Sequence, residues 1–382
     1  MSARRTSPRL AGALAALLVA ALSLLTAAPQ AGASPSPQRE VGVASYNLFL
    51  GGNIGSLVEP EVDTVPEFVA AAAALWQNVV ATDFPARAEA IADLLAEDDP
   101  DVVGLQEVAN WATTSLSGAP VPSYDFQELL LDALAERGTP YRVIASNTNF
   151  VSPTVPIPPL GLAVRFTDRD VVIARADLPT SRLKAANPQS HTFVAGIPVT
   201  LPVGSTRIIR GWSTVDVKVR GKTFRFANTH LEAFSATVRN LQAAELAESL
   251  TASPHPVVLV GDLNSQRRDE EPEGDDVVAY ETLTSIGLAD AWIEAPGTGD
   301  GDTSGQTDPL TNVPSKIDHR IDYVLYEPEP DSPEDPVIEA TEAHVVGEEL
   351  ADRATSTVTG APRLLWPSDH AGVVATLHIG RP

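Results

Sequence analysis

Residues 257–264 read VVLVGDLN, a run of four apolar residues followed by a polar turn. Three of the four are valines, and a short run that is apolar throughout is typical of a strand buried on both faces. Gly261, Asp262 and Asn264 then supply the residue types of a tight turn. Because loops held at the ends of a buried sheet often bind ligands, the segment predicts either a structural turn or one wall of a functional site.

Five further polar clusters lie next to predicted strands in the same way. They are Ser45-Tyr46-Asn47, Gln106-Glu107, Asn228-Thr229-His230-Leu231, Arg320-Ile321-Asp322-Tyr323 and Ser368-Asp369-His370. Any one of them has a simple explanation, since Asp or Asn at a strand end is often only a local cap. Six such clusters in one chain predict instead that these strand ends converge on a single site.

Strand-like and helix-like segments alternate between these clusters, as in a layered α/β or α+β domain. Strands are expected at 41–50, 101–105, 141–145, 170–174, 214–219, 223–229, 257–260, 321–326 and 372–379. Helices are expected at 87–97, near 126–134 and near 238–250, where apolar residues recur at helical spacing. A turn at 220–222 predicts a hairpin. No repeat or long linker divides the series, so residues 34–382 are expected to form a single domain.

Residues 1–33 are predicted to be a signal peptide and not part of the fold. Arg4, Arg5 and Arg9 precede an apolar run, and Ala31-Gly32-Ala33 has the small-x-small form of a cleavage site. The apolar run is also long enough for a retained membrane anchor, which is the less favoured alternative. We therefore expect a secreted protein. Because the chain has no Cys, it would fold outside the cell without disulfides.

The chain is strongly acidic. Its 382 residues include 50 Asp and Glu against 26 Lys and Arg, a formal charge of −24. Residues 1–33 contain three of those bases and no acid, so 34–382 carry 23 bases against 50 acids, or −27. Polyanion binding depends on clustered Lys and Arg, so no stable nucleic-acid clamp is expected. An anionic substrate would need a local source of positive charge, such as a metal ion.

Taken in order, the six clusters resemble the endonuclease/exonuclease/phosphatase superfamily, which includes deoxyribonuclease I, abasic-site endonucleases, inositol polyphosphate phosphatases and neutral sphingomyelinases. The matching residues run from Asn47 to His370. The resemblance implies a four-layer α/β sandwich, with two mixed β-sheets packed face to face and helices outside. It also implies divalent-metal-dependent hydrolysis of a phosphoric ester, by metal-assisted attack of water on phosphorus.

The resemblance implies that Glu107 is the main metal ligand, with Asn47 and Asp369 completing the shell. Hard oxygen donors suit Mg²⁺, and Mn²⁺ or another divalent cation is the alternative. Whether one or two metal ions bind is left open.

Catalytic roles are implied in the same way. Asp262 and Asn264 would orient the attacking water and hold a phosphoryl oxygen, and Asp322 would hold His370 in one tautomer. His230 would donate to the phosphoryl group or protonate the leaving oxygen. Asp262 and His370 both remain candidates for the general base.

Asn228 and Arg175 are expected to bind substrate. Arg175 follows the strand 170–174, and a surface ion pair is the alternative for it. Glu232 stands where relatives often have a second His, which removes one candidate phosphate contact. Weaker candidates near the clusters are Asn53, Asp170, Arg239, Gln242 and His319.

Three functions fit these observations. The first is a secreted hydrolase of a small phosphate ester or a phospholipid head group, in the manner of a phospholipase C or sphingomyelinase. The second is an extracellular endonuclease or exonuclease for DNA or RNA. The third, a noncatalytic binding module, is disfavoured because the acid, base and metal-ligand set is complete. Net charge favours the first. A monomer is expected.

Two features bear on the substrate. The Pro-rich apolar segments Phe150–Leu162 and Phe193–Val203 either pack together over one edge of the core or contact a lipid surface or an apolar leaving group. The basic residues around the predicted hairpin either line a nucleic-acid groove or face solvent. These residues are Arg207, Arg210, Lys218, Arg220, Lys222 and Arg225.

Overall fold

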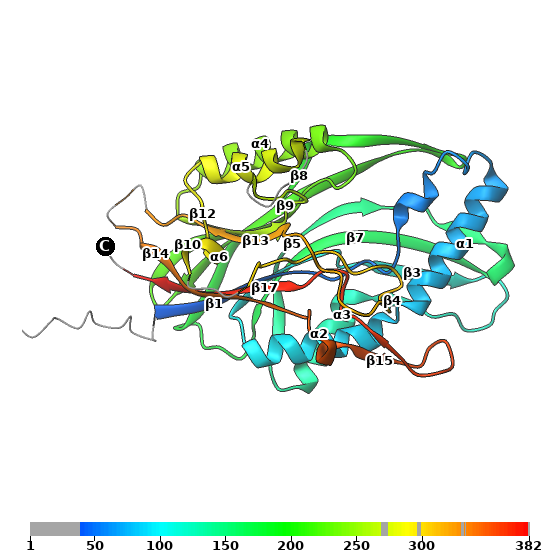
Figure 1. Ribbon diagram of the computed structural model, residues 1–382, viewed down its shortest axis with the longest axis horizontal. Coiled ribbons are helices and arrows are strands. Elements are labelled where there is room, and N and C mark those ends of the chain that lie inside the picture. The colour runs from blue at the N-terminus through cyan, green and yellow to red at the C-terminus, as the bar shows by residue number, and fades with distance from the viewer. Residues whose placement is uncertain (1–38, 269–273, 296–298, 330–331, 333, 381–382) are drawn as a thin grey trace, which may run out of the picture. The chain divides into compact units, whose positions relative to one another are not determined.

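The computed structural model describes residues 39–268, 274–295, 299–329, 332 and 334–380 (Figure 1). The expected signal peptide and part of the acidic segment 267–276 lie outside these residues. Among the helices that are described, none is long and apolar enough to cross a membrane.

The first sheet contains strands from both ends of the chain. Its order is β14-β17-β1-β2-β7-β3-β4, with β5 and β6 also paired to β7. The strands are β1 (Glu40–Asn47), β2 (Val102–Gln106), β3 (Asn110–Ser115), β4 (Tyr124–Asp125), β5 (Tyr141–Val151), β6 (Val155–Ile157), β7 (Leu162–Arg175), β14 (Ile338–Val346) and β17 (Gly372–Ile379). β1 is parallel to β2 and antiparallel to β17, so the sheet is mixed.

The second sheet has the order β12-β13-β11-β10-β9-β8. Its strands are β8 (Leu183–Leu201), β9 (Gly204–Val219), β10 (Lys222–His230), β11 (Val257–Asp262), β12 (Ala289–Asp290) and β13 (Asp322–Tyr326). β10 is parallel to β11, whereas β13 and β9 are antiparallel to their neighbours. A small separate hairpin pairs β15 (Ala354–Ser356) with β16 (Arg363–Leu365).

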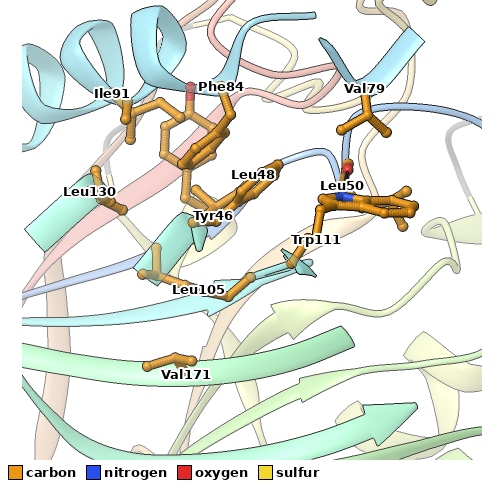
Figure 2. Packing of buried hydrophobic residues seen from close by; sticks show 14 of the residues in the cluster. Tyr46, Leu48, Leu50, Val79, Phe84, Ile91, Leu105, Trp111, Leu130 and Val171 are labelled. Carbon is orange, nitrogen blue, oxygen red and sulfur yellow. Dashed lines mark hydrogen bonds between the residues drawn. The ribbon is translucent and has the colours of Figure 1, made fainter. Parts of the chain in front are cut away.

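Helices cover the outer face of each sheet (Figure 1). The first sheet is covered by α1 (Val65–Ala81), α2 (Phe84–Asp98) and α3 (Phe126–Glu136), and the second by α4 (Ala236–Thr251) and α5 (Val278–Ser285). Shorter helices are η2 (Ile54–Leu57), η3 (Pro158–Leu160), η5 (Gly274–Val277), α6 (Ala291–Glu294) and η6 (Leu350–Asp352). Figure 2 shows Tyr46 and Leu105 of the first sheet packed with Ile91 and Leu130 of its helices. These layers confirm the predicted four-layer sandwich.

Alternate side chains of the central strands enter different cores. On β11, Val258 and Val260 pack between the two sheets, whereas Val257 and Leu259 pack against α4 and α5. Both faces of the strand are therefore buried, because successive side chains point to opposite sides of a sheet. This explains why residues 257–260 are apolar without interruption.

Several elements differ from the sequence prediction: β3, β14 and α5 were not predicted, and β7 and β9 begin well before the strands expected at 170–174 and 214–219. α1 was not predicted either, although Phe68, Ala72, Leu75, Trp76 and Val79 recur at helical spacing and Thr64 and Glu67 cap each other at its start. β8 extends to Leu201, within the Pro-rich segment 193–203, where no strand was predicted. β8 is the edge strand of its sheet, where Pro198 does not have to donate a ladder hydrogen bond. The hairpin predicted around residues 220–222 is confirmed by β9 and β10.

Arg87 of α2 is fully buried and holds several chain segments together. Its guanidinium donates hydrogen bonds to the carbonyl oxygens of Thr82 (2.9 Å), Leu48 (2.7 Å), Phe49 (3.0 Å) and Pro367 (2.9 Å). Burial lowers the pKa of Arg87 to about 10, which leaves it charged at neutral pH. Leu48 and Phe49 lie in the loop after β1 and Pro367 lies in the loop before β17, so the Arg87 side chain connects these two loops.

Replacing Arg87 by Lys should lower the free energy of unfolding by about 3 kcal/mol or more. An ammonium group cannot reach all four carbonyls, and each buried acceptor left without a donor costs roughly 1–3 kcal/mol. Urea unfolding followed by tryptophan fluorescence measures the change. The matched control is Arg268→Lys, whose exposed ion pair with Glu281 should contribute little to stability. Equal stability of the Arg87→Lys variant and the wild type would contradict this role.

Candidate active site

The carboxyl ends of two parallel strand pairs meet at one end of the sandwich. Asn47 at the end of β1 pairs in register with Gln106 at the end of β2. His230 at the end of β10 pairs in register with Asp262 at the end of β11, and Asp322 opens β13 directly opposite Asp262. The polar strand ends identified in the sequence are therefore brought together.

Side-chain hydrogen bonds join the two sheets at this end. Asn47 Nδ2 donates to Asp262 Oδ2 (3.0 Å), and Gln106 Nε2 donates to Asn228 Oδ1 (2.7 Å). Asn228 Nδ2 donates in turn to backbone carbonyls of β2 and β7. Asn228 is fully buried, and its amide groups are bonded within the protein. The expected role of Asn228 in binding substrate is therefore corrected: it connects the two sheets.

Arg175 lies away from the site. β7 runs antiparallel to β2, so its last residue lies beside the start of β2 and not beside Gln106 and Glu107. The Arg175 guanidinium instead forms ion pairs with Asp99 and Asp177. The substrate-binding role expected for Arg175 is thus wrong, and the alternative of an ion pair holds.

His370 is oriented by a buried carboxylate. Its Nδ1 lies 2.7 Å from Asp322 Oδ2, which also accepts a hydrogen bond from Thr303 Oγ1 (2.6 Å). The other ring nitrogen, Nε2, faces Asp262 Oδ2 at 3.9 Å and Asp369 Oδ1 at 4.0 Å. Burial lowers the pKa of His370, but the three surrounding carboxylates raise it well above its ordinary value. The imidazole is consequently held as a cation among acids.

Asp262 is held in place at both oxygens. Oδ2 accepts the hydrogen bond from Asn47, and Oδ1 accepts one from the backbone N–H of Asn264 (2.9 Å). Asn264 adopts a left-handed backbone (φ +46°), which turns the chain directly after the strand. Its Nδ2 donates to the Leu231 carbonyl (3.1 Å) and lies 3.2 Å from His230 Nε2. Burial raises the pKa of Asp262 to about 6, so the carboxyl is ionised at neutral pH.

His230 is neutral, and its tautomer follows from its neighbours. Burial, then the charges of Arg210 and His370, lower its pKa well below the ordinary value. Arg210 NH1 lies 3.1 Å from His230 Nδ1 and 3.3 Å from Asp168 Oδ2. Because a guanidinium can only donate, the contact with Arg210 requires Nδ1 to accept and the ring proton to sit on Nε2, so the approach of Asn264 Nδ2 to Nε2 is not a hydrogen bond. That N–H points toward the site, 3.5 Å from Asp262 Oδ2.

Glu107 and Asp369 form a second acidic group. Glu107 has a left-handed backbone (φ +55°), and its Oε2 accepts a hydrogen bond from the backbone N–H of Leu50 (2.7 Å). Burial, then the charges of Asp369 and Asp168, raise the pKa of Glu107 to about 8. Burial also raises the pKa of Asp369. The charge of Asp369 therefore makes Glu107 harder to ionise, whereas the charges of His370 and Arg87 oppose the effect of burial at Asp369.

These residues fit a divalent metal ion. Glu107 is a buried carboxyl whose ionised form a hard cation would stabilise, and Asn47 Oδ1 keeps one lone pair beside its bond from Phe49 N–H. Among the described residues, the acids and histidine whose ligand atoms all lie within 4.8 Å of one another are Asp262, Asp322 and His370. In that grouping His370 is already bonded to Asp322, so we favour the Glu107 side.

A polar cleft of about 640 Å³ opens beside Asn264. Arg239 and His319 line it, and they pair with the acids Asp276 (2.5 Å) and Asp318 (2.7 Å). The cleft borders the site through Asn264, whose Nδ2 lies 3.2 Å from His230 Nε2. Two of the weaker sequence candidates therefore lie near the site.

No site role for Asp168 and Arg210 was predicted from the sequence. Arg210 contacts His230 Nδ1 and pairs with Asp168. Asp168 and Asp170 on β7 face Asn149 of the paired strand β5, whose Nδ2 donates to both (3.2 and 2.9 Å). The alternate positions of Asn147 and Asn149 on β5, and of Asp168 and Asp170 on β7, were a signal for this buried cluster. Arg210 had been grouped with the basic hairpin residues, but it is buried and turned toward the site.

The basic hairpin residues do not form one groove. Arg207 donates to the Val194 carbonyl, and Arg225 pairs with Asp216 (2.7 Å) near the other end of the long β9. Those that remain exposed, such as Lys218, face solvent. The alternative of a solvated hairpin face therefore holds over that of a nucleic-acid groove.

Comparison with known proteins gives a consistent result. The model of the endonuclease/exonuclease/phosphatase family matches residues 44–370. A Bacteroides thetaiotaomicron structure described as a member of this family is 18% identical, with a TM-score of 0.53 over 90% of this chain and 98% of that one. The mannosyl-6-phosphatase Bt3783 of the same species is 19% identical, with a TM-score of 0.52 over 88% and 99%. No curated protein matches significantly. The chain therefore belongs to the endonuclease/exonuclease/phosphatase family.

Proposed function

We propose that the protein is an exported, Mg²⁺-dependent phosphoric ester hydrolase that acts on a small phosphate ester or a phospholipid head group. Family membership supports the phosphoesterase class. The observation that carries the proposal is the buried pair of His370 and Asp322, which faces Asp262 beside the acidic pair of Glu107 and Asp369. Export by residues 1–33 is part of the proposal.

In this proposal Glu107, Asp369 and Asn47 hold the metal. The ion would neutralise charge on the phosphoryl oxygens and favour ionisation of a bound water. The remaining steps depend on the side chains that surround the phosphate.

Protonation states support Asp262 as the general base. A base must be ionised before it can accept a proton, and the pKa of Asp262 is about 6 whereas His370 keeps its proton. His370 would then donate to a phosphoryl oxygen as a cation. His230, neutral with its proton on Nε2, would donate a second hydrogen bond there. Asn264 would help to fix the phosphate between them.

The charge distribution supports a small ester over a nucleic acid. A duplex substrate needs a row of free bases along its path, but Arg210 is buried beside Asp168 and Arg225 pairs with Asp216. The described walls of the polar cleft also carry acids, including Asp318.

Glu107→Gln should weaken Mg²⁺ binding at least about tenfold and lower phosphodiesterase activity with it, because one anionic ligand is lost. Isothermal titration with Mg²⁺ and hydrolysis of bis-p-nitrophenyl phosphate measure the two effects, and EDTA should abolish wild-type turnover. Glu248→Gln, on an exposed position of α4, is the control and should change neither. Full activity of Glu107→Gln in EDTA would refute the metal assignment.

The pH profile of kcat/KM should be bell-shaped. Activity should fall as the pH drops through about 6, because Asp262 gains a proton, and fall again at high pH when His370 loses its proton. His370→Gln should slow turnover about 10²–10⁴-fold and remove the alkaline limb alone. His255→Gln, remote from the site, should keep both limbs. A wild-type rate that stays constant from about pH 7 down to 5 would rule out Asp262 as the base.

A substrate panel under one Mg²⁺ condition separates the ester hydrolase from the nuclease. We expect kcat/KM for at least one small ester or head group to exceed that for nucleic acid by about tenfold or more, equivalent to roughly 1.4 kcal/mol. The panel comprises sphingomyelin, phosphatidylcholine, inositol phosphates, nucleotides, RNA and plasmid DNA. Rapid plasmid nicking without turnover of any ester would favour the nuclease instead.

A further inference from the structure

An apolar cavity of about 120 Å³ lies where η2 and α1 meet the tips of both sheets. The two Pro-rich apolar segments, 150–162 and 193–203, each form part of its wall. Apolar side chains dominate the lining, and they include the aromatic rings of Trp76, Trp111, Phe150 and Phe166. The two segments therefore lie together, as one of the two alternatives from the sequence predicted, but they line a cavity.

Two contacts connect this cavity with the active site. Asp168 and Arg210 are its charged lining residues, and Arg210 NH1 also contacts His230 Nδ1 at 3.1 Å. On the other side, the Leu50 carbonyl accepts a hydrogen bond from Trp111 Nε1 (2.8 Å), while the Leu50 N–H donates to Glu107. Figure 2 shows Trp111 beside Leu50 in this arrangement. The cavity is thus connected to the imidazole through Arg210, and to Glu107 through Trp111 and Leu50.

The size and lining of the cavity select its occupant. An apolar cavity of about 150 Å³ in another protein stays dry and binds benzene, so this space would take one aromatic ring or a short branched alkyl group. Water needs two or more polar partners, and the walls away from Asp168 and Arg210 are mostly apolar. Aromatic rings pack favourably against ring faces and edges such as those of Trp76 and Phe166.

The cavity can be entered from outside. Val199 of β8 and Ile208 of β9 are partly exposed at its edge, and Val58 after η2 is 46% exposed. Ile208 also shares a strand face with Arg210, because the two are separated by two positions on β9. A ligand passing Ile208 would therefore approach the charged end that contacts His230.

We propose that this cavity binds an apolar group, about the size of one aromatic ring, on the alcohol portion of the phosphate ester. The inference rests on the proposed function, since that site must hold the phosphate while the ring enters the cavity. Hydrolysis then breaks the bond between phosphorus and the alcohol oxygen; water supplies a hydroxyl group to phosphorus and a proton to the alcohol. The preferred substrates are accordingly esters of aryl-bearing or short branched alcohols.

The first test compares benzyl and glyceryl esters, as phosphates and as methyl phosphates, at saturating Mg²⁺. Burial of a ring should make kcat/KM about 10- to 100-fold higher for the benzyl ester. Ile208→Trp should fill the cavity and remove this preference without changing the rate for the glyceryl ester. Ile208→Phe, a smaller addition, should reduce it in part. Val194→Trp on β8 is the matched control, since Val194 is 77% exposed and outside the cavity, and it should keep the preference.

A second test needs no turnover. Calorimetric titration should show benzylphosphonate binding at least about tenfold more tightly than methylphosphonate, with the difference lost in Ile208→Trp and kept in Val194→Trp. Equal affinities, or a preference that survives in a folded Ile208→Trp variant, would overturn the cavity assignment. If esters are hydrolysed with Mg²⁺ but without aromatic preference, the proposed function stands and this inference fails. If no ester is hydrolysed, the proposed function fails and the titration alone decides the cavity.

Discussion

Negative charge held out of water at one end of the sandwich is the constraint on which the site depends. Burial favours protonated carboxyls, and it raises the pKa of Asp262 and of Glu107. The protein offsets this at Asp262 and Asp322 with the cationic His370. Among the described residues, no Lys or Arg forms an ion pair with Glu107. Asp369 also lies 4.0 Å from His370 Nε2, so Glu107 is the acid whose balance would come mainly from a metal ion.

Such a site can form only if strand ends from both sheets are aligned. Apolar packing between the sheets provides most of the driving force, but it is nondirectional. The directional contacts are polar and buried: Gln106 bonds to Asn228 across the sheets, and Arg87 binds the loops after β1 and before β17. Because an unpaired polar group inside the core is costly, a shift of one sheet against the other would break these contacts. The same contacts therefore stabilise the fold and align the site.

The fold and most of the site could be predicted from sequence, for reasons that also explain the errors. Residues 257–264 predict a strand and its polar end, because neighbouring residues alone decide where a strand ends. Arg175 also ends a strand, but the direction of β7 relative to β2 places it at the opposite edge, and the sequence does not state that direction. Asn228 precedes His230 by two positions and shares its face, yet it lies deeper between the sheets. Arg210 becomes part of the site only because β8 and β9 form a long hairpin.

The buried ion pair of Asp168 and Arg210 connects the apolar cavity with the active site. Removing two charges from water costs free energy that an ion pair does not always recover, so apolar side chains would serve a purely structural wall better. Here the guanidinium also bonds to His230 Nδ1, which keeps the proton on Nε2 facing the site. A ring bound in the cavity would pack against the pair that sets this tautomer. Recognition of the apolar group and presentation of the hydrogen-bond donor would then depend on one guanidinium.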